Sequence, residues 1–313
     1  MIEPVLSVDL GGTRMRAAVV APGGAVLRRR VEPTPRRAAC PDALFALMAG
    51  FLETTGVTEA VVGVPGRVDY ATGRLEHAPN LPPGWAPALS EERLSSLLGV
   101  PVALANDADL AAVGEALFGA GRYYRDVVYL TLSTGVGAGV VLDGRVVHGR
   151  RSLAEVGHTV IDRVACAAGQ PATLEDLASG TALARLAADA GLGGDGATVV
   201  RLVQTGHPGA RAVWDRVVAA AAIGVANLAH LYSPDVVVIG GGLGRVGSLL
   251  LDPIRAHLTR HGPRGLTVDV VGAALGDDAG LTGAAGWRES FAREVVLDDE
   301  PRPSTALHWQ RFG

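Results

Sequence analysis

Short apolar runs that end in glycine turns recur along this chain and predict β-strands. In the first copy of the pattern, three such runs are joined by turns, at residues 5–9, 17–21 and 25–31. The second copy repeats this order within residues 127–148, and its last turn is Asp143-Gly144, a strong hairpin signal between two apolar runs. Strand, glycine turn, strand, turn and strand therefore occur twice, which predicts a duplicated fold.

Longer segments with helical spacing lie between these strands and further apolar runs. Helices are expected at residues 42–54, 91–98, 108–118, 181–190, 209–231, 247–260 and 279–291. Further strands are expected at residues 60–64, 102–105, 235–239 and 267–271. This alternation of strands and helices predicts an α/β architecture.

The boundary between the two halves is expected near residues 119–121, where a helix stops and charged residues precede the second copy of the strand pattern. We therefore expect a smaller N-terminal α/β domain at 1–118 and a larger α/β domain at 119–289, with a cleft between them. Part of residues 290–313 is expected to join the smaller domain. The last residues, 297–313, have no helical periodicity and are expected to form an extended strap.

Composition narrows the class of protein. The 313 residues are 48% hydrophobic, enough for two cores, and the net charge of -4 gives no reason to expect a nucleic-acid or membrane partner. Every basic residue is an arginine, so chemistry that needs a Schiff-base or P-loop lysine is excluded. Cys40 and Cys166 are too few for a disulfide framework, and the chain opens in a strand without a leader, so we expect a cytoplasmic protein. The apolar stretch 217–232 is expected to be a buried helix, because it is shorter than a membrane span and contains polar residues.

Three glycine turns follow predicted strands and suit phosphate or nucleotide binding, because glycine lets backbone N–H groups approach an anion closely. The first contains Asp9, Gly11, Gly12 and Thr13, and the second contains Thr134, Gly135 and Gly137. The third is Gly240, Gly241 and Gly242, where an adenosine moiety can approach the end of a buried strand. Either of the first two turns alone could be an ordinary hairpin. The third begins a match to the dinucleotide pattern Gly-x-Gly-x-x-Gly, but no acidic residue ends the next strand, so NAD is not expected.

Polar side chains suited to hydroxyl groups lie after these turns. Asn106-Asp107 follows a short strand and opens a helix, where Asp107 could face a crevice or could serve only as a helix cap. Glu155, His158 and Glu175 lie within one loop region. Carboxylates with an imidazole suit sugar hydroxyls, each of which donates and accepts a hydrogen bond. The alternative explanation for these residues is a solvated loop.

Taken in order, these motifs resemble those of the ROK family (repressor, open reading frame, kinase), within the actin-like sugar kinase superfamily. The resemblance covers about residues 5–288. It is carried by the segments 9–13, 106–115, 132–137, 155–158, 174–175, 239–242 and 275–285, with 65–66 and 80–81. Any one motif is moderately specific, whereas their ordered series is highly specific. The resemblance implies two actin-like (ribonuclease H-like) domains with an interdomain cleft.

The resemblance also implies roles for individual residues. ATP would be bound by Asp9, Gly11, Gly12, Thr13, Arg14, Thr134, Gly135, Gly137, Gly240, Gly241 and Gly242. The sugar would be bound by Gly66, Asn80, Asn106, Asp107, Glu155, His158 and Glu175. Asp107 would be the catalytic residue, and Asp9 would face Mg²⁺ through water. An ordinary aspartate has a pKa of about 4, so Asp107 is expected to orient the sugar hydroxyl and accept its proton late in a loose transition state.

Two departures from the family pattern change what we expect. ROK proteins combine the histidine of Glu-x-Gly-His with three cysteines in a zinc site, whereas this sequence keeps only His158 and Cys166. A structural zinc normally takes four ligands, so no tightly bound zinc is expected. Asp109 stands where asparagine is usual and Arg14 where lysine is frequent, which affects fine specificity more than reaction type.

The expected activity is ATP-dependent phosphorylation of a hexose, with glucose and its 6-hydroxyl favoured. Kinases for fructose, N-acetylglucosamine or N-acetylmannosamine are alternatives, as is a non-catalytic sugar-sensing ROK protein. ROK regulators carry a helix-turn-helix domain before the first phosphate motif, and only eight residues precede Asp9 here, so DNA binding is not expected. The resemblance further implies a homodimer or homotetramer.

Overall fold

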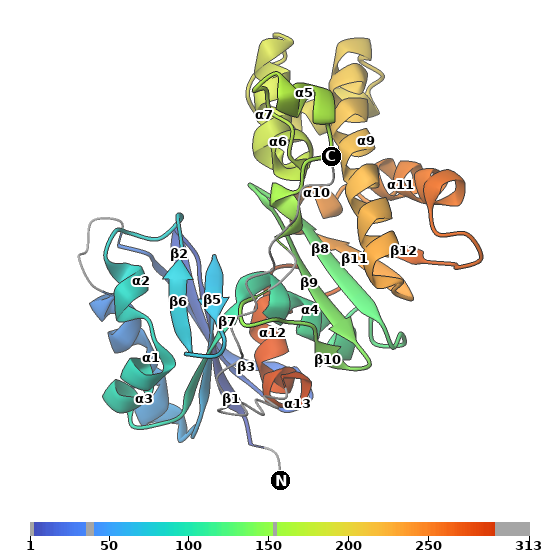
Figure 1. The fold of residues 1–313 in the computed structure, drawn as a ribbon. Helices are drawn as coiled ribbons and strands as arrows, with labels where there is room; N and C mark the ends of the chain where they lie inside the picture. Colours follow the sequence, from blue (N-terminus) through green and yellow to red (C-terminus); the bar gives the residue numbers. More distant parts are fainter. Residues whose placement is uncertain (1–2, 36–40, 153–154, 292–313) are drawn as a thin grey trace, which may run out of the picture.

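Two lobes, each built on a five-stranded sheet, make up the fold (Figure 1). The structure is a computed structural model that describes residues 3–35, 41–152 and 155–291. The first sheet has the strand order β3-β2-β1-β4-β7, and the second has the order β10-β9-β8-β11-β12. In both sheets, the first three strands of the order are antiparallel and the last two are parallel to their neighbours. The repeated strand pattern of the sequence therefore corresponds to a repeated topology.

The central strands of both sheets are buried on both faces. The first sheet consists of β1 (Val5–Leu10), β2 (Arg14–Val20), β3 (Val26–Pro33), β4 (Ala60–Val64) and β7 (Val102–Asn106). The second consists of β8 (Val127–Leu132), β9 (Val136–Leu142), β10 (Arg145–Val146), β11 (Val236–Gly240) and β12 (Asp269–Gly272). Burial on both faces explains why β4 and β11 consist of valine, isoleucine, alanine and glycine without a polar residue. The β9–β10 turn has φ angles of 52° at Asp143 and 73° at Gly144, as the predicted Asp-Gly hairpin requires.

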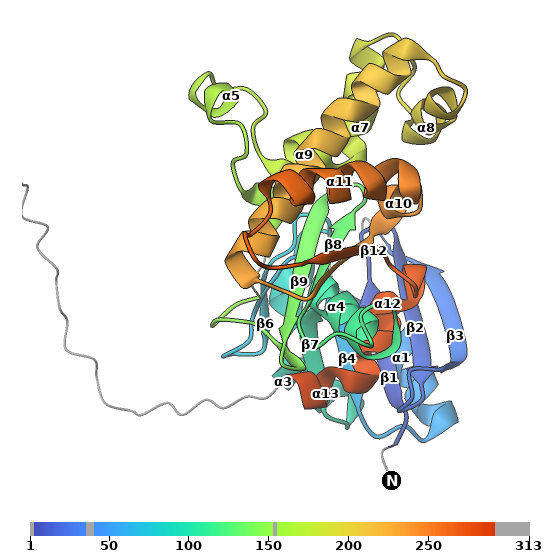
Figure 2. The ribbon, with the colours of Figure 1, turned by 90° about the vertical axis from the view of Figure 1, so that its right-hand side faces the viewer.

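Helices cover the outer face of each sheet (Figures 1 and 2). The first sheet is covered by α1 (Asp42–Thr55) and α3 (Glu91–Leu98). The second is covered by α9 (Pro208–Tyr232) and α11 (Ser248–His261), and α9 also carries α6 (Leu174–Ala178), α7 (Gly180–Asp189) and α8 (Gly196–Gln204). By length and composition α9 could cross a membrane, but 67% of its most apolar window is buried inside the fold. It is a core helix of the second lobe, as the sequence predicted.

Two helices fill the space between the sheets (Figure 2). These are α4 (Asp107–Phe118) and α12 (Ala279–Gly283), which pack against each other and against strands of the first sheet, while α4 also contacts β8 and β9. Glycine permits this close approach, because a Cβ on Gly114 would lie 2.2 Å from the Ala279 carbonyl oxygen and a Cβ on Gly283 would lie 1.9 Å from the Leu110 carbonyl oxygen. The chain therefore returns from the second lobe to the first through α12.

The C-terminal part differs from the sequence prediction. The prediction of a single helix at residues 279–291 was wrong, because the segment divides into α12, a 3-10 turn η3 (Ala284–Gly286) and α13 (Trp287–Ser290). All three parts contact α4, and Leu281 and Trp287 are buried in the core of the first lobe. The division into 1–118 and 119–289 thus stays a prediction, with residues 279–291 packed on the first-lobe side. The predicted strap at 297–313 lies outside the described residues.

Several elements were not predicted from the sequence, and all of them except α8 are too short to show a clear period of polar and apolar residues. They are β5 (Arg67–Asp69), β6 (Arg74–His77), α2 (Trp85–Ala88), α5 (Arg163–Ala167), α10 (Gly241–Gly244), η1 (Val156–His158) and η2 (Gly276–Asp278), together with α6 and α8. The β5–β6 hairpin matters for function because it lies beside the interlobe cleft.

Candidate active site

The carboxyl ends of the central strands of both sheets border the cleft between the lobes. In the first sheet, the parallel strands β1, β4 and β7 end beside one another, and in the second sheet β8 and β11 do the same. Ligands of open α/β sheets bind outside such strand ends. Two adjoining cavities lie at this place, and residues of both lobes line each of them.

The first cavity, which we call the sugar-side cavity, has a volume of ≈ 570 Å³. It brings together every residue predicted to bind the sugar, namely Gly66, Asn80, Asn106, Asp107, Glu155, His158 and Glu175. The second glycine turn lies on its wall through Thr134, Gly135 and Gly137. Arg67 and His77, from the β5–β6 hairpin, also line it and were not found from the sequence. Gly66 needs to be glycine, because its φ is 121° and a Cβ would lie 2.1 Å from the His77 carbonyl oxygen.

The second cavity, the nucleotide-side cavity, has a volume of ≈ 280 Å³ and is lined by Asp9 and by residues of the third glycine turn. Those turn residues are Gly240, Gly241 and Gly242. Tyr129, Arg16, Arg245 and Asp277 line the cavity as well and were missed by sequence reasoning. These side chains come from both lobes, and of the four only Asp277 lies in a segment that carries the family resemblance, 275–285.

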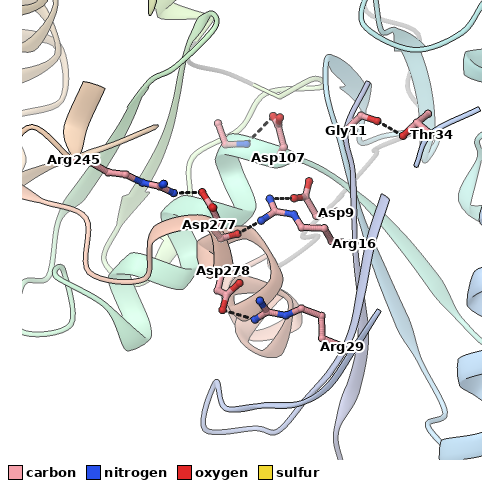
Figure 3. Close-up of polar contacts among 10 residues, drawn as sticks. Asp9, Gly11, Arg16, Arg29, Thr34, Asp107, Arg245, Asp277 and Asp278 are labelled. Carbon is pink, nitrogen blue, oxygen red and sulfur yellow. Dashed lines mark hydrogen bonds and ion pairs between the residues drawn. The ribbon is translucent and has the colours of Figure 1, made fainter. Parts of the chain in front are cut away.

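The remaining residues of the first glycine turn lie beside the sugar-side cavity without lining it. Gly11, Gly12, Thr13 and Arg14 are not part of either lining. A Cβ on Gly12 would lie 2.4 Å from the Asn80 carbonyl oxygen, so the turn packs closely on the segment that carries Asn80. The Gly11 carbonyl accepts a hydrogen bond of 2.6 Å from the Thr34 hydroxyl (Figure 3). In this arrangement, Gly11 and Gly12 pack on neighbouring chain, and Thr13 and Arg14 are exposed.

Asp107 lies where the two cavities meet, because it lines both of them. The preceding residue, Asn106, holds the turn in place. Its Oδ1 accepts hydrogen bonds from the backbone N–H groups of Ala108 (2.9 Å) and Asp109 (3.2 Å) and its Nδ2 donates to the Gly66 carbonyl (2.9 Å). Asn106 is therefore the N-cap of α4, and the carboxyl of Asp107 faces the cleft, with one hydrogen bond of 2.9 Å from the Ala108 N–H (Figure 3).

The electrostatic surroundings change the expected chemistry of Asp107. Asp107 is exposed to the cleft, but protein atoms of both lobes surround it, and this partial desolvation, helped by the negative charges of Asp9 and Glu155, raises the pKa of Asp107 to about 7. The pKa of about 4 that an ordinary aspartate would have is therefore wrong for this residue. A carboxylate with a pKa near neutrality is a more effective proton acceptor at neutral pH.

Asp9 takes part in a chain of charged groups across the mouth of the nucleotide-side cavity (Figure 3). Arg16 forms an ion pair with Asp9 and donates a hydrogen bond of 2.6 Å to the Asp277 carbonyl, and the Asp277 carboxylate accepts from Arg245. Burial raises the pKa of Asp9, against the opposing effect of Arg16. The Asp9 carboxylate is thus held by a cation of the same lobe.

Protein ligands for a metal are few. In the part of the chain that the structure describes, no group of three or more His, Cys, Asp or Glu side chains could hold a metal ion. Asp9 is a suitable ligand for Mg²⁺, because one or two protein carboxylates are enough when phosphates and water complete the coordination shell of the ion. Cys166 is an exposed free thiol near the start of the second lobe's helical region, and Cys40 lies outside the described residues.

Glu175 connects the sugar-side cavity to the second glycine turn. It lies in the first turn of α6, and its Oε2 accepts a hydrogen bond of 2.8 Å from the backbone N–H of Val136, within the second glycine turn. A side chain at position 135 would displace this carboxylate, because a Cβ on Gly135 would lie 2.4 Å from the same oxygen. Glu155 and His158 face each other at 3.8 Å between Oε2 and Nε2, and both side chains are exposed.

Comparison with known proteins identifies the family. The ROK family model matches residues 5–290. The chain belongs to the ROK family. A glucokinase from Thermotoga maritima is 33% identical to this ROK protein over 304 residues, which cover 90% of this chain and 96% of the relative. An N-acetylmannosamine kinase from Salmonella typhi is 32% identical over 295 residues, with 90% and 96% covered.

The solved structures agree with this assignment. A crystal structure of a ROK family glucokinase from Streptomyces griseus in complex with glucose and AMPPNP matches with a TM-score of 0.74 and 34% identity, covering 90% of this chain and 98% of that chain. The predicted ROK membership and the two actin-like α/β domains are confirmed, and so is the prediction of an ATP-dependent sugar kinase. The relatives act on more than one sugar by name, so the substrate needs a separate argument.

Proposed function

We propose that this ROK kinase transfers the γ-phosphoryl group of ATP to the 6-hydroxyl of glucose. The observation that carries the proposal is the position of Asp107, which borders a cavity lined by hydroxyl-binding side chains and a cavity lined by a glycine-rich strand end. Phosphoryl transfer needs the two substrates to meet at one point with the reacting atoms in line. Glucose is favoured by similarity to the Thermotoga maritima and Streptomyces griseus glucokinases.

Residues on two walls of the sugar-side cavity would bind the ring hydroxyls. Glu155, His158 and Glu175 would bind one edge of the ring, and Asn106 with Asp107 would bind the opposite edge. Carboxylates accept hydrogen bonds from hydroxyls, while the imidazole and the amide can also donate. Because Glu175 also accepts from the Val136 N–H, a bound sugar would be connected to the second glycine turn through one side chain.

On the catalytic side, Asp107 would orient the 6-hydroxyl and receive its proton as the new O–P bond forms. With a pKa of about 7, a large fraction of Asp107 is ionised at neutral pH and can accept that proton. Most of the rate would still come from holding the hydroxyl in line with the γ-phosphoryl group and from stabilising charge on its oxygens. The backbone N–H groups of the turns at 134–137 and 240–242 are the candidates for that stabilisation, except the Val136 N–H, which donates to Glu175.

Asp9 is the residue proposed to bind magnesium. The Asp9 carboxylate lines the nucleotide-side cavity and would hold the ion through water. Mg²⁺, when bound with ATP, supplies positive charge beside the phosphate oxygens. Arg16, which pairs with Asp9, lies within reach of the same region and adds a fixed positive charge.

An ATP-consumption assay across a panel of sugars tests the proposal. The panel contains glucose, fructose, N-acetylglucosamine and N-acetylmannosamine, and ADP release is followed with and without each sugar. We expect glucose to give the highest kcat/KM and glucose 6-phosphate as product. A higher kcat/KM for N-acetylmannosamine would contradict the choice of glucose, and no sugar-stimulated ADP release would contradict the kinase assignment in favour of a sugar sensor.

A further inference from the structure

A buried tyrosine and a buried aspartate lie directly behind the catalytic turn and have no part in the chemistry described above. Asp109 is 0% exposed and Tyr70 is 2% exposed. The Tyr70 hydroxyl donates a hydrogen bond of 2.7 Å to Asp109 Oδ2 and accepts one of 3.1 Å from the backbone N–H of Asn106. A tyrosine hydroxyl has one proton to donate and lone pairs that accept. It donates here to the Asp109 carboxylate and accepts from the Asn106 N–H, so all three groups have a hydrogen-bond partner.

We propose that Tyr70 and Asp109 form a positioning pair that holds the Asn106–Asp107 turn and connects it to the contact between the lobes. The inference rests on the proposed function, since it assumes that the position of Asp107 sets the rate. Neither residue touches the sugar-side or nucleotide-side cavity. Their effect on catalysis would therefore pass through Asn106, whose backbone N–H the pair binds and whose side chain caps α4 and binds the Gly66 carbonyl.

The cost of burying Asp109 supports a purpose beyond packing. Within the described part of the chain, no hydrogen-bond partner reaches its second oxygen, Oδ1. A buried carboxyl with one unpartnered oxygen is destabilising compared with an apolar side chain of similar size. Such groups persist in folded proteins where they hold a particular geometry, and here the geometry held is that of the turn which begins at Asn106.

Tyr70 also lies at the junction of the two lobes. Its backbone N–H donates a hydrogen bond of 2.8 Å to the Arg150 carbonyl, and the neighbouring Asp69 carboxylate accepts one of 2.9 Å from the Arg150 side chain. Arg150 follows β10 of the second lobe, whereas Tyr70 follows β5 of the first. The tyrosine ring packs edge-on against His148 of the second lobe, with ring centroids 5.4 Å apart, and against Phe291, with centroids 4.7 Å apart.

The consequence is that one side chain touches both lobes and the catalytic turn. A movement of the second lobe relative to the first would act on Tyr70 through the Arg150 and His148 contacts, and through its hydroxyl on Asn106. Closure of a kinase cleft is the step at which reacting groups reach their final positions, and small displacements of a reacting group reduce the rate strongly. The pair would therefore act on turnover rather than on sugar affinity.

Tyr70→Phe is the most direct test, because it removes the hydroxyl and keeps the ring contacts. We expect kcat to fall about tenfold or more, with the sugar KM changed by about threefold or less. Asp109→Asn keeps an oxygen that accepts from Tyr70 and is expected to retain most of the turnover, whereas Asp109→Ala should lose about as much as Tyr70→Phe. Tyr124→Phe is the matched control, since it removes another Tyr–Asp hydrogen bond, of 2.8 Å to Asp269, far from the turn.

The outcomes separate the positioning pair from the proposed function. Asp107→Asn is assayed in the same series, with circular dichroism to confirm folding. Loss of turnover in Asp107→Asn together with a Tyr70→Phe turnover within about twofold of the wild type would overturn the positioning pair alone. Normal turnover in Asp107→Asn would overturn the catalytic assignment on which it rests. If Tyr70→Phe does not fold, equal turnover of Asp109→Asn and Asp109→Ala overturns the pair, and a loss confined to the alanine variant supports it.

Discussion

Replacement of Asp109 by asparagine is expected to remove a pH-dependent loss of stability that the wild-type protein carries. Asp109 is fully buried, and burial is the main reason why its pKa is raised from 3.8 to about 7, with a smaller increase from the nearby negative charge of Asp107. The hydrogen bond from Tyr70 acts in the opposite direction but does not cancel the effect of burial. Asparagine has nearly the same shape and keeps an acceptor for Tyr70, but it has no proton to lose.

The size of the effect follows from proton linkage. Between pH 5 and pH 7, the unfolded chain has released the Asp109 proton while the folded protein still holds it, so the free energy of unfolding falls as pH rises. Each pH unit in this range is worth about 1.4 kcal/mol, which gives a loss of about 2–3 kcal/mol between pH 5 and pH 8. Asp107 adds to the difference in the same direction, because its pKa falls when the charge at position 109 is removed.

Urea unfolding followed by circular dichroism at pH 5 and pH 8 measures this difference. Relative to the wild type, Asp109→Asn should be more stable at pH 8 than at pH 5 by about 2–3 kcal/mol. Ser7→Ala is the control, because it alters a fully buried hydroxyl that has no proton titrating in this range and no hydrogen-bond partner among the described residues, so its effect should be the same at both pH values. An Asp109→Asn effect that is equal at both pH values would refute the reasoning about Asp109.

Three further predictions concern the site. Wild-type turnover is expected to fall about tenfold for each pH unit below the Asp107 pKa of about 7. In Asp109→Asn this fall should begin at a lower pH, and because the ionisation of ATP is the same for both proteins, such a shift belongs to Asp107. Gly135→Ala would place a Cβ 2.4 Å from the Glu175 carboxylate, so we expect the sugar KM to rise about tenfold or more, while Gly23→Ala, with no heavy atom within 4 Å of its Cβ, should leave KM unchanged. Metal analysis of the purified protein is expected to find no stoichiometric zinc, and one zinc per chain would contradict the prediction made from His158 and Cys166.

Much of the fold could be predicted because its central strands are buried on both faces. The apolar run at residues 60–64 coincides with β4, and the run at 235–239 lies one residue from β11. These strands end directly in the polar or glycine residues that line the cleft, so the motif positions could also be predicted. The division of residues 279–291 into α12, η3 and α13 could not be predicted, because these parts pack on α4, a segment distant in the chain.

The site was predicted where a residue follows a strand, and missed where packing brings distant segments together. Tyr70 comes from a short hairpin with no clear period, and its partner Asp109 lies 39 residues later in the chain. Arg16 lies opposite Asp9 in the antiparallel β1–β2 pair and lines the cavity, but its contact with the Asp277 carbonyl exists only after the chain returns through η2. The pKa of Asp107 is likewise a property of its surroundings, since burial beside Asp9 and Glu155 sets it.

The central claim is that Asp107 orients the sugar hydroxyl and accepts its proton. The most direct test is the steady-state kinetics of Asp107→Asn with glucose, together with glucose binding measured by calorimetry. Asparagine keeps the size of the side chain but cannot accept the proton, so sugar affinity should stay within several-fold while turnover falls by about two or more orders of magnitude. Near-normal turnover in this variant would contradict the account.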